Sequence, residues 1–200
     1  MMNILLDILP EEVTVNGKTY FIDTDFRTFI IFEKIVLDPA LTARERITNL
    51  LDLVYTEEVP IDVEAAFLAA VDVYKCGDSK PSRPSAVKKN GDVELKPKLI
   101  YDYEKDAPYI YAAFLQQYGI DLNEIVYMHW WKFHALFNGL TSSTKIVEIM
   151  GYRATDLSKI KDKDERARLA KLKRIYDLPT NYTYEDKVAM AGASFGGVAF

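Results

Sequence analysis

The amino-acid sequence predicts a mainly α-helical protein with a small β-hairpin near its N-terminus and a mobile linker in the middle. Apolar residues recur every three or four positions along much of the chain, which is the period of a helix with one buried face. Asn16-Gly17 lies between two short β-prone runs, and Asn-Gly is the strongest short signal for a tight hairpin. Residues 77–99 contain three prolines, two glycines and six basic residues, with few large apolar side chains to bury.

These patterns divide the chain into four predicted parts. An N-terminal part with the hairpin and several helices precedes the linker, and a helical core half follows it. A flexible tail rich in Gly, Ala and Phe ends the chain. The predicted bounds are residues 1–76, 77–99, 100–187 and 188–200.

The N-terminal part is predicted to hold the hairpin and three helices. A two-stranded hairpin is marginal alone, so we expect it to pack on the helix that follows it. That helix should end at Asp38, because a residue before proline avoids the α conformation. Thr42 and Glu45 form a capping box at the start of the next helix. The elements are expected at residues 13–22, at 25–37, from 42 onward and at 62–74.

The second half is predicted to hold four helices. Asp106 is expected to cap the first, and Gly119 should end it. The second has an apolar stripe over about five turns and is the predicted central core helix. The third should stop at Gly151, and the fourth is highly charged. They are expected at residues 106–118, 121–140, 144–150 and 164–176.

Composition limits the classes of protein that the chain can belong to. With 200 residues and 49% hydrophobic content, it can bury a sizeable core. The single cysteine, Cys76, cannot form an internal disulfide, which fits a reducing compartment. The N-terminus shows neither a basic leader nor a long apolar run, so a cytoplasmic protein without membrane contact is expected. A net charge of -5 opposes general affinity for nucleic acid.

Two groups of polar residues could suggest a catalytic or metal site. His129 and His134 are five positions apart, about 140° around a helix, so they would not share a ligand face. A buried imidazole with a backbone partner explains His129 better. The carboxylates of Asp102, Glu104 and Asp106 are more typical of a helix N-terminus than of acid–base catalysis.

The tail contains a G-x-S-x-G pattern at residues 192–196, the pattern of a nucleophile elbow. Only four residues follow it and both histidines precede it, so the downstream acid and histidine of that motif cannot be supplied. The sequence therefore predicts no catalytic residue, no cofactor and no metal site. A non-enzymatic protein is the expectation.

The charged helix at residues 164–176 has two interpretations. Its Lys and Arg side chains could contact nucleic acid. Asp162 and Arg166, and likewise Asp164 and Arg168, have the i, i+4 spacing of paired charges on a solvated helix face, which we favour. If these cations are functional, an acidic protein surface suits the overall charge better. Arg166 and Lys173 are the candidate contact residues for such a partner.

Five short motifs in the second half resemble the bacteriophage gene-product-fifteen family. Members of this family come from tail gene clusters of long-tailed phages and prophages of Gram-positive bacteria. The resemblance covers nearly the whole chain, up to about residue 187. The motifs lie at residues 101–107, 110–114, 118–122, 129–133 and 151–153.

The resemblance implies a tail assembly chaperone that binds the tape measure protein, the tail tube protein or both. Such a protein would act in the cytoplasm of the bacterial host and be absent from the mature virion. The protein could also form a homo-oligomer. Two other functions remain as alternatives: a structural tail component retained in the virion and a nucleic-acid-binding phage regulator.

The family supplies no catalytic residue to this chain. Tyr127 and Trp131 fall off the main apolar stripe of the expected 121–140 helix, so they are the candidate partner contacts. Ordinary packing against neighbouring helices is an equally good account of both.

Overall fold

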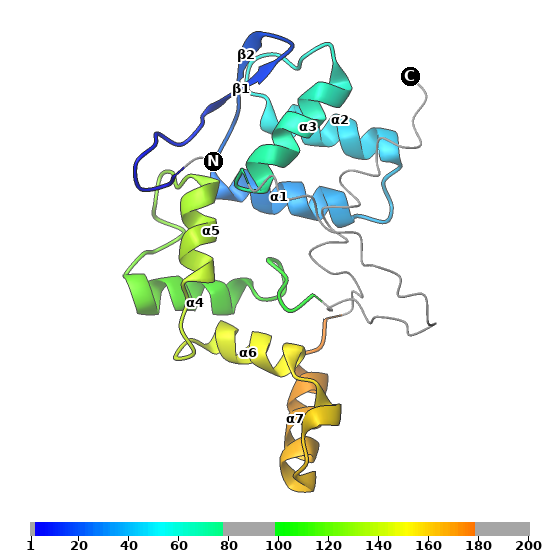
Figure 1. Cartoon of the computed structure of the whole chain (residues 1–200), viewed down its shortest axis with the longest axis vertical. Helices are drawn as coiled ribbons and strands as arrows, with labels where there is room; N and C mark the ends of the chain where they lie inside the picture. The colour runs from blue at the N-terminus through cyan, green and yellow to red at the C-terminus, as the bar shows by residue number, and fades with distance from the viewer. Residues whose placement is uncertain (1–2, 78–98, 179–200) are drawn as a thin grey trace. The chain divides into compact units, whose positions relative to one another are not determined.

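The structure is a computed structural model that describes residues 3–77 and 99–178. In these ranges the chain forms seven α-helices, one short 3-10 helix and a two-stranded hairpin (Figure 1), which confirms the predicted fold class. Most of the predicted linker and the whole predicted tail lie outside the described residues. The elements are β1 (Glu12–Val15), β2 (Lys18–Phe21), α1 (Phe26–Leu37), α2 (Ala43–Val54), α3 (Val63–Tyr74), α4 (Ala107–Tyr118), α5 (Trp130–Asn138), α6 (Lys145–Ala154), η1 (Leu157–Lys159) and α7 (Lys163–Ile175).

The described residues fall into two compact units. Unit 1 comprises residues 3–77 and 126–136, and unit 2 comprises residues 99–125 and 137–178. The predicted division at residue 76 placed residues 126–136 in the C-terminal half, whereas in the structure they belong to unit 1. No helix in the described ranges has the length and apolar composition needed to cross a membrane.

The hairpin of unit 1 forms at the predicted position. Asn16 and Gly17 both have positive φ, 51° and 81°, as a type I′ turn requires, and Val15 pairs with Lys18 across it. A Cβ added at Gly17 would meet no atom within 4 Å, so glycine is required here by the backbone conformation alone. The Asn-Gly signal therefore located the turn correctly.

The predicted packing partner of the hairpin was wrong. β1 packs on α3, whereas the sequence suggested the helix that follows the hairpin. The reason lies in the backbone after β2, where Ile22 bridges to Tyr55 at the end of α2 and the Asp23 N–H donates to the Val54 carbonyl at 2.8 Å. These bonds tie the hairpin to the connection between α2 and α3.

The core of unit 1 is aromatic. Phe29 and Phe32 of α1 are fully buried, and both stack with Tyr74 of α3. Trp130 stacks with Tyr74 and with Phe29 at ring-centroid distances of 5.8 Å and 5.6 Å. Offset stacks of this kind add stability beyond the area that they bury.

The predicted continuous helix over residues 121–140 was wrong, because α5 begins only at Trp130. The residues before it pair with the start of α1: the Phe26 N–H donates to the Met128 carbonyl at 2.9 Å, and the Trp130 N–H donates to the Thr24 carbonyl at 2.7 Å. His129 forms an isolated antiparallel bridge with Asp25. This pairing holds the segment extended, and helical periodicity cannot reveal it because the partners are about 100 positions away.

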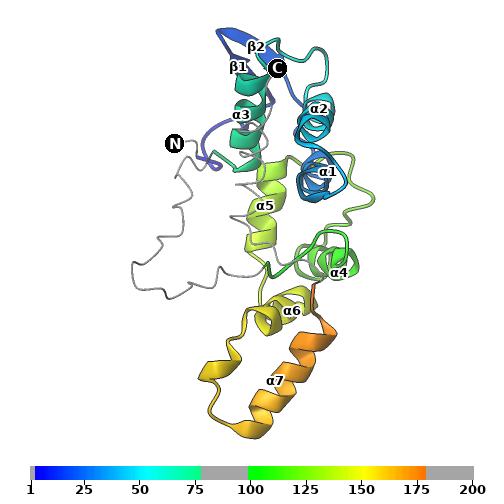
Figure 2. The same ribbon diagram turned by 90° about the vertical axis from the view of Figure 1, so that its right-hand side faces the viewer.

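Unit 2 packs α4 on α6 and α6 on α7, and the segment containing η1 runs beside α7 (Figure 2). α4 ends at Gly119 as predicted, with φ 66° in the left-handed region. α6 does not stop at Gly151 but continues to Ala154, which corrects the prediction. Gly151 does not have the positive φ of a helix-terminating glycine.

A buried ion pair joins two of the motifs that identify the family resemblance. Arg153 Nη1 and Nη2 lie 2.5 Å and 2.9 Å from the Asp106 carboxylate oxygens, and neither side chain is more than 6% exposed. Arg153 also donates to the carbonyls of Ile100 and Tyr176. Asp106 occupies the N-cap position of α4 as predicted, but its side chain makes no capping hydrogen bond. Its carboxylate pairs with Arg153, and Arg153 therefore ties three segments of unit 2 together.

Candidate partner-binding pocket

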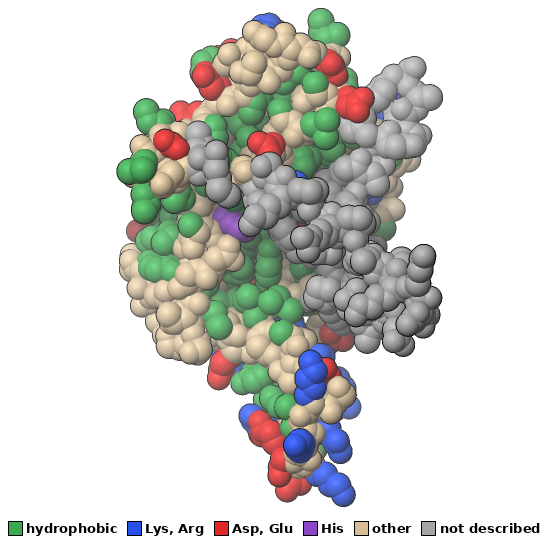
Figure 3. Space-filling view, viewed as in Figure 1, with side chains coloured by type: hydrophobic (Ala, Val, Ile, Leu, Met, Phe, Trp, Pro, Cys, Tyr) green, Lys and Arg blue, Asp and Glu red, His purple; other side chains and the backbone are tan. Residues whose placement is uncertain are grey.

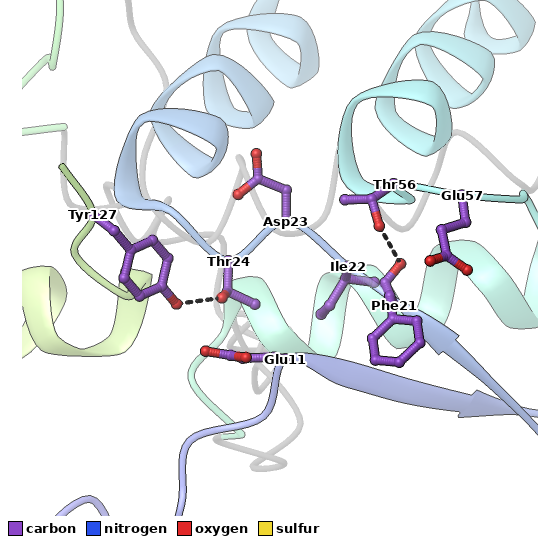
Figure 4. A pocket seen from close by; sticks show the side chains of 8 residues that line it. All are labelled: Glu11, Phe21, Ile22, Asp23, Thr24, Thr56, Glu57 and Tyr127. Atoms are coloured by element: carbon purple, nitrogen blue, oxygen red, sulfur yellow. Dashed lines mark hydrogen bonds between the residues drawn. The ribbon is translucent and has the colours of Figure 1, made fainter.

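Unit 1 contains a pocket of about 480 Å³, which we call the hairpin pocket (Figure 4). It is formed by residues on both sides of the hairpin, by the connection between α2 and α3, and by one residue that precedes α5. Its lining residues are Glu11, Phe21, Ile22, Asp23, Thr24, Thr56, Glu57 and Tyr127.

Backbone and side-chain hydrogen bonds fix the turn between β2 and α1 that lines the pocket. The Asp23 carboxylate accepts from the Asp25 N–H at 2.9 Å and from the Thr28 hydroxyl at 2.8 Å. The Asp25 carboxylate in turn caps α1 by accepting from the Arg27 N–H, and it also accepts from the Met128 N–H at 3.1 Å. This wall of the pocket is therefore set before any partner binds.

Two partly exposed aromatic rings line the pocket. Phe21 is 53% exposed and Tyr127 is 46% exposed, so a partner can reach both rings. The Tyr127 hydroxyl and the Thr24 hydroxyl share a hydrogen bond of 2.7 Å, drawn as a dashed line in Figure 4. This bond holds the ring of Tyr127 in place while its face stays accessible.

The charge of the pocket is negative. Glu11, Asp23 and Glu57 contribute carboxylates, and none of the described lining residues is Lys or Arg. Burial raises the pKa of Tyr127, the Thr24 hydrogen bond opposes that rise, and the negative charges of Glu11, Asp25 and Asp23 raise the pKa further. The pocket therefore combines apolar surface with groups that accept hydrogen bonds and attract cations.

Tyr127 is the predicted site residue that the structure places in the pocket. Trp131 lies in unit 1 as well, but it is only 7% exposed, and its indole N–H donates to the Val73 carbonyl at 2.7 Å. Trp131 is therefore packed against its neighbours, as the alternative interpretation of this residue expected. Its role in binding a partner stays a prediction.

Arg166 and Lys173 both lie on α7 of unit 2. Arg166 is exposed, whereas Lys173 Nζ donates to the Thr155 carbonyl at 2.7 Å. Figure 3 shows Lys and Arg side chains mixed with Asp and Glu side chains over this helix. Both roles stay predictions.

The predicted charge pairs of α7 differ from those in the structure. Arg168 pairs with Glu165 at 2.7 Å, three positions away, and the expected pairing was with Asp164. The Asp162 carboxylate caps the helix by accepting from the Glu165 N–H, where a pair with Arg166 was expected.

His129 is a buried imidazole with backbone partners, as predicted. Its Nε2 lies 3.0 Å from the Pro10 carbonyl, and its Nδ1 accepts from the Trp131 N–H at 3.0 Å. A carbonyl only accepts and an amide only donates, so the ring is neutral with its proton on Nε2. Burial lowers the pKa of His129, and burial also lowers that of His134. Among the described residues, no three His, Cys, Asp or Glu side chains are placed to hold a metal ion.

The sequence did not single out Glu11, Phe21 or Glu57 as site residues. Glu11 precedes β1, Phe21 ends β2, and Glu57 follows α2. The backbone bridges at Ile22 and His129 bring these segments together. The sequence signal nearest to the pocket was the apolar pair Val126-Tyr127. The backbone just after this pair lies beside the start of α1. Val126 is 97% exposed.

Comparison with known proteins identifies the family. The model of the family described as bacteriophage Gp15 protein matches residues 5–178. No curated protein and no solved structure matches the chain. The family match includes all ten elements of the fold, the hairpin pocket and the Asp106–Arg153 pair. The chain therefore belongs to the bacteriophage Gp15 protein family, as its motifs indicated.

Proposed function

We propose that this phage protein is a non-enzymatic tail assembly chaperone that binds the tape measure protein during tail morphogenesis. Tail tube subunits are the second proposed partner. A tape measure protein is a very long, apolar, helical chain, and it would aggregate before the tube polymerises around it. A chaperone must therefore offer apolar surface to that chain and later release it.

The observation that carries this proposal is the apolar surface of unit 1. The hairpin pocket presents Phe21 and Tyr127, and several other apolar side chains of the same unit are exposed. Exposed apolar side chains give an apolar partner chain a surface to pack against. Those exposed by more than 80% are Leu5, Leu6, Ile8, Ile61 and Val126.

Co-expression with the tape measure protein encoded nearby tests the proposal. We expect more of the tape measure protein to stay in the supernatant after centrifugation, and we expect a complex to be recovered through a tag on this protein. Equal insolubility with and without this protein, and no complex, would reject the chaperone function.

We also propose that the protein acts in the host cytoplasm and leaves before the virion is complete. Mass spectrometry of purified phage particles distinguishes this from a structural tail component. A chaperone should be absent from the particles, whereas a constant number of copies for each tail would identify a structural component.

A further inference from the structure

We infer that the hairpin pocket binds a Lys or Arg side chain carried by an apolar helix of the partner protein. The inference rests on the proposed function for the identity of the partner. The chemistry of the bound side chain rests on the pocket itself.

The charge of the hairpin pocket is complementary to that of Lys and Arg. Glu11 and Glu57 are exposed, and among the described residues neither belongs to an ion pair. The carboxylate of Asp23, by contrast, is held by Asp25 and Thr28. Two carboxylates are thus available to a cation from outside, and a partner with negative charge would be repelled.

Aromatic side chains line the pocket together with these carboxylates. Lys and Arg side chains have apolar stems and charged ends, so they bind best where apolar surface leads to acceptor oxygens. The faces of Phe21 and Tyr127 can also attract a cation directly. A volume of about 480 Å³ accommodates one such side chain together with apolar neighbours on the same helix.

The experiment uses the full chain and a synthetic helical peptide of about 20 residues in which Leu and Lys alternate at helical spacing. A Leu/Glu peptide of the same pattern is the control. In an NMR titration, we expect the Leu/Lys peptide to shift the signals of Glu11, Phe21, Glu57 and Tyr127, and we expect the Leu/Glu peptide not to do so.

A pair of double variants tests the role of the carboxylates. E11Q/E57Q should weaken binding of the Leu/Lys peptide about fivefold to tenfold, because two surface charge pairs are lost. E12Q/E124Q removes two exposed carboxylates outside the pocket and should change the affinity by less than about twofold. Circular dichroism melting checks that both variants stay folded.

Equal affinity of E11Q/E57Q and E12Q/E124Q for the Leu/Lys peptide would overturn the inference, as would shifts confined to residues outside the pocket. Either result can occur while the wild-type chain still keeps the tape measure protein soluble, and then the chaperone function stands. If the peptide binds in the pocket but the tape measure protein is not retained, the inference stands and the chaperone function fails.

Discussion

At the scale of single residues, several buried polar groups in each unit have specific partners. In unit 1 the Tyr74 hydroxyl donates to the buried Glu33 carboxylate at 2.8 Å, and the Trp130 indole N–H donates to the Tyr74 carbonyl at 2.8 Å. In unit 2 Arg153 satisfies one carboxylate and two carbonyls. Removing one partner of such a bond leaves a buried polar group unpaired, which costs more than the bond itself contributes.

Arg153→Ala should lower the free energy of unfolding of unit 2 by about 3–5 kcal/mol, because it leaves the buried Asp106 carboxylate without a counter-charge. Urea unfolding followed by far-UV circular dichroism measures the change. Arg168→Ala is the matched control in the same unit, and loss of its exposed pair with Glu165 should cost less than about 1 kcal/mol. Similar losses in the two variants would contradict a structural role for the Asp106–Arg153 pair.

Trp131→Phe should destabilise unit 1 by about 0.5–1.5 kcal/mol, because the Val73 carbonyl loses the indole donor but keeps the Cys76 N–H. Affinity for the Leu/Lys peptide should stay unchanged, since the ring is buried. Tyr127→Ala is expected to show the opposite pattern, with weaker peptide binding and a smaller loss of stability. Weaker peptide binding by a fully folded Trp131→Phe variant would show that this tryptophan contacts the ligand.

Unit 1 should lose stability as the pH falls below about 6.5. Burial lowers the pKa of His129 in the folded chain, so the unfolded chain binds a proton first as the pH falls. Each unit of pKa difference corresponds to about 1.4 kcal/mol. Thermal melts between pH 7.5 and 5 measure the effect, and H129Q/H134Q should reduce the slope. An unchanged slope in that variant would assign the pH dependence to other groups.

At the scale of elements, local signals predicted most helices and the hairpin correctly. The capping box at Thr42, the Asn16-Gly17 turn and the stop at Gly119 depend on neighbouring residues only, so the sequence reveals them. The start of α5 depends on backbone pairing with the segment before α1, and the continuation of α6 depends on the conformation of Gly151. Those two boundaries could not be read from periodicity.

The candidate site was predicted only in part, for the same reason. Tyr127 was selected because it falls off the apolar stripe of the expected 121–140 helix, and although the chain is not helical at that position, Tyr127 lies in the hairpin pocket. Glu11, Phe21 and Glu57 join it through contacts between distant parts of the chain. Local patterns contain no information about such contacts.

Two glycines of unit 2 should respond in opposite ways to alanine. Gly119→Ala forces a side chain into φ 66° and should cost about 1–2 kcal/mol. Gly151→Ala lies in a helix with no atom within 4 Å of the new Cβ, and it should add about 0.5–1 kcal/mol. Chemical denaturation of both variants measures the difference. A loss of stability in Gly151→Ala would show that α6 is not regularly helical at that position.

At the scale of the whole molecule, the chain belongs to a phage protein family, and its described residues form two compact units. Unit 1 contains the hairpin pocket and the apolar side chains that are more than 80% exposed, and unit 2 contains the Asp106–Arg153 pair and the charged helix α7. The proposed function assigns partner binding to the surface of unit 1. The polar network of unit 2 stabilises its own fold.

The most direct test of this account is the fraction of tape measure protein that stays soluble. It is measured with no chaperone and on co-expression with the wild-type chain, with E11Q/E57Q or with E12Q/E124Q. We predict a large soluble fraction with the wild type and with E12Q/E124Q, and a clearly smaller one with E11Q/E57Q. A soluble fraction that is the same with the wild type as with no chaperone would contradict the account.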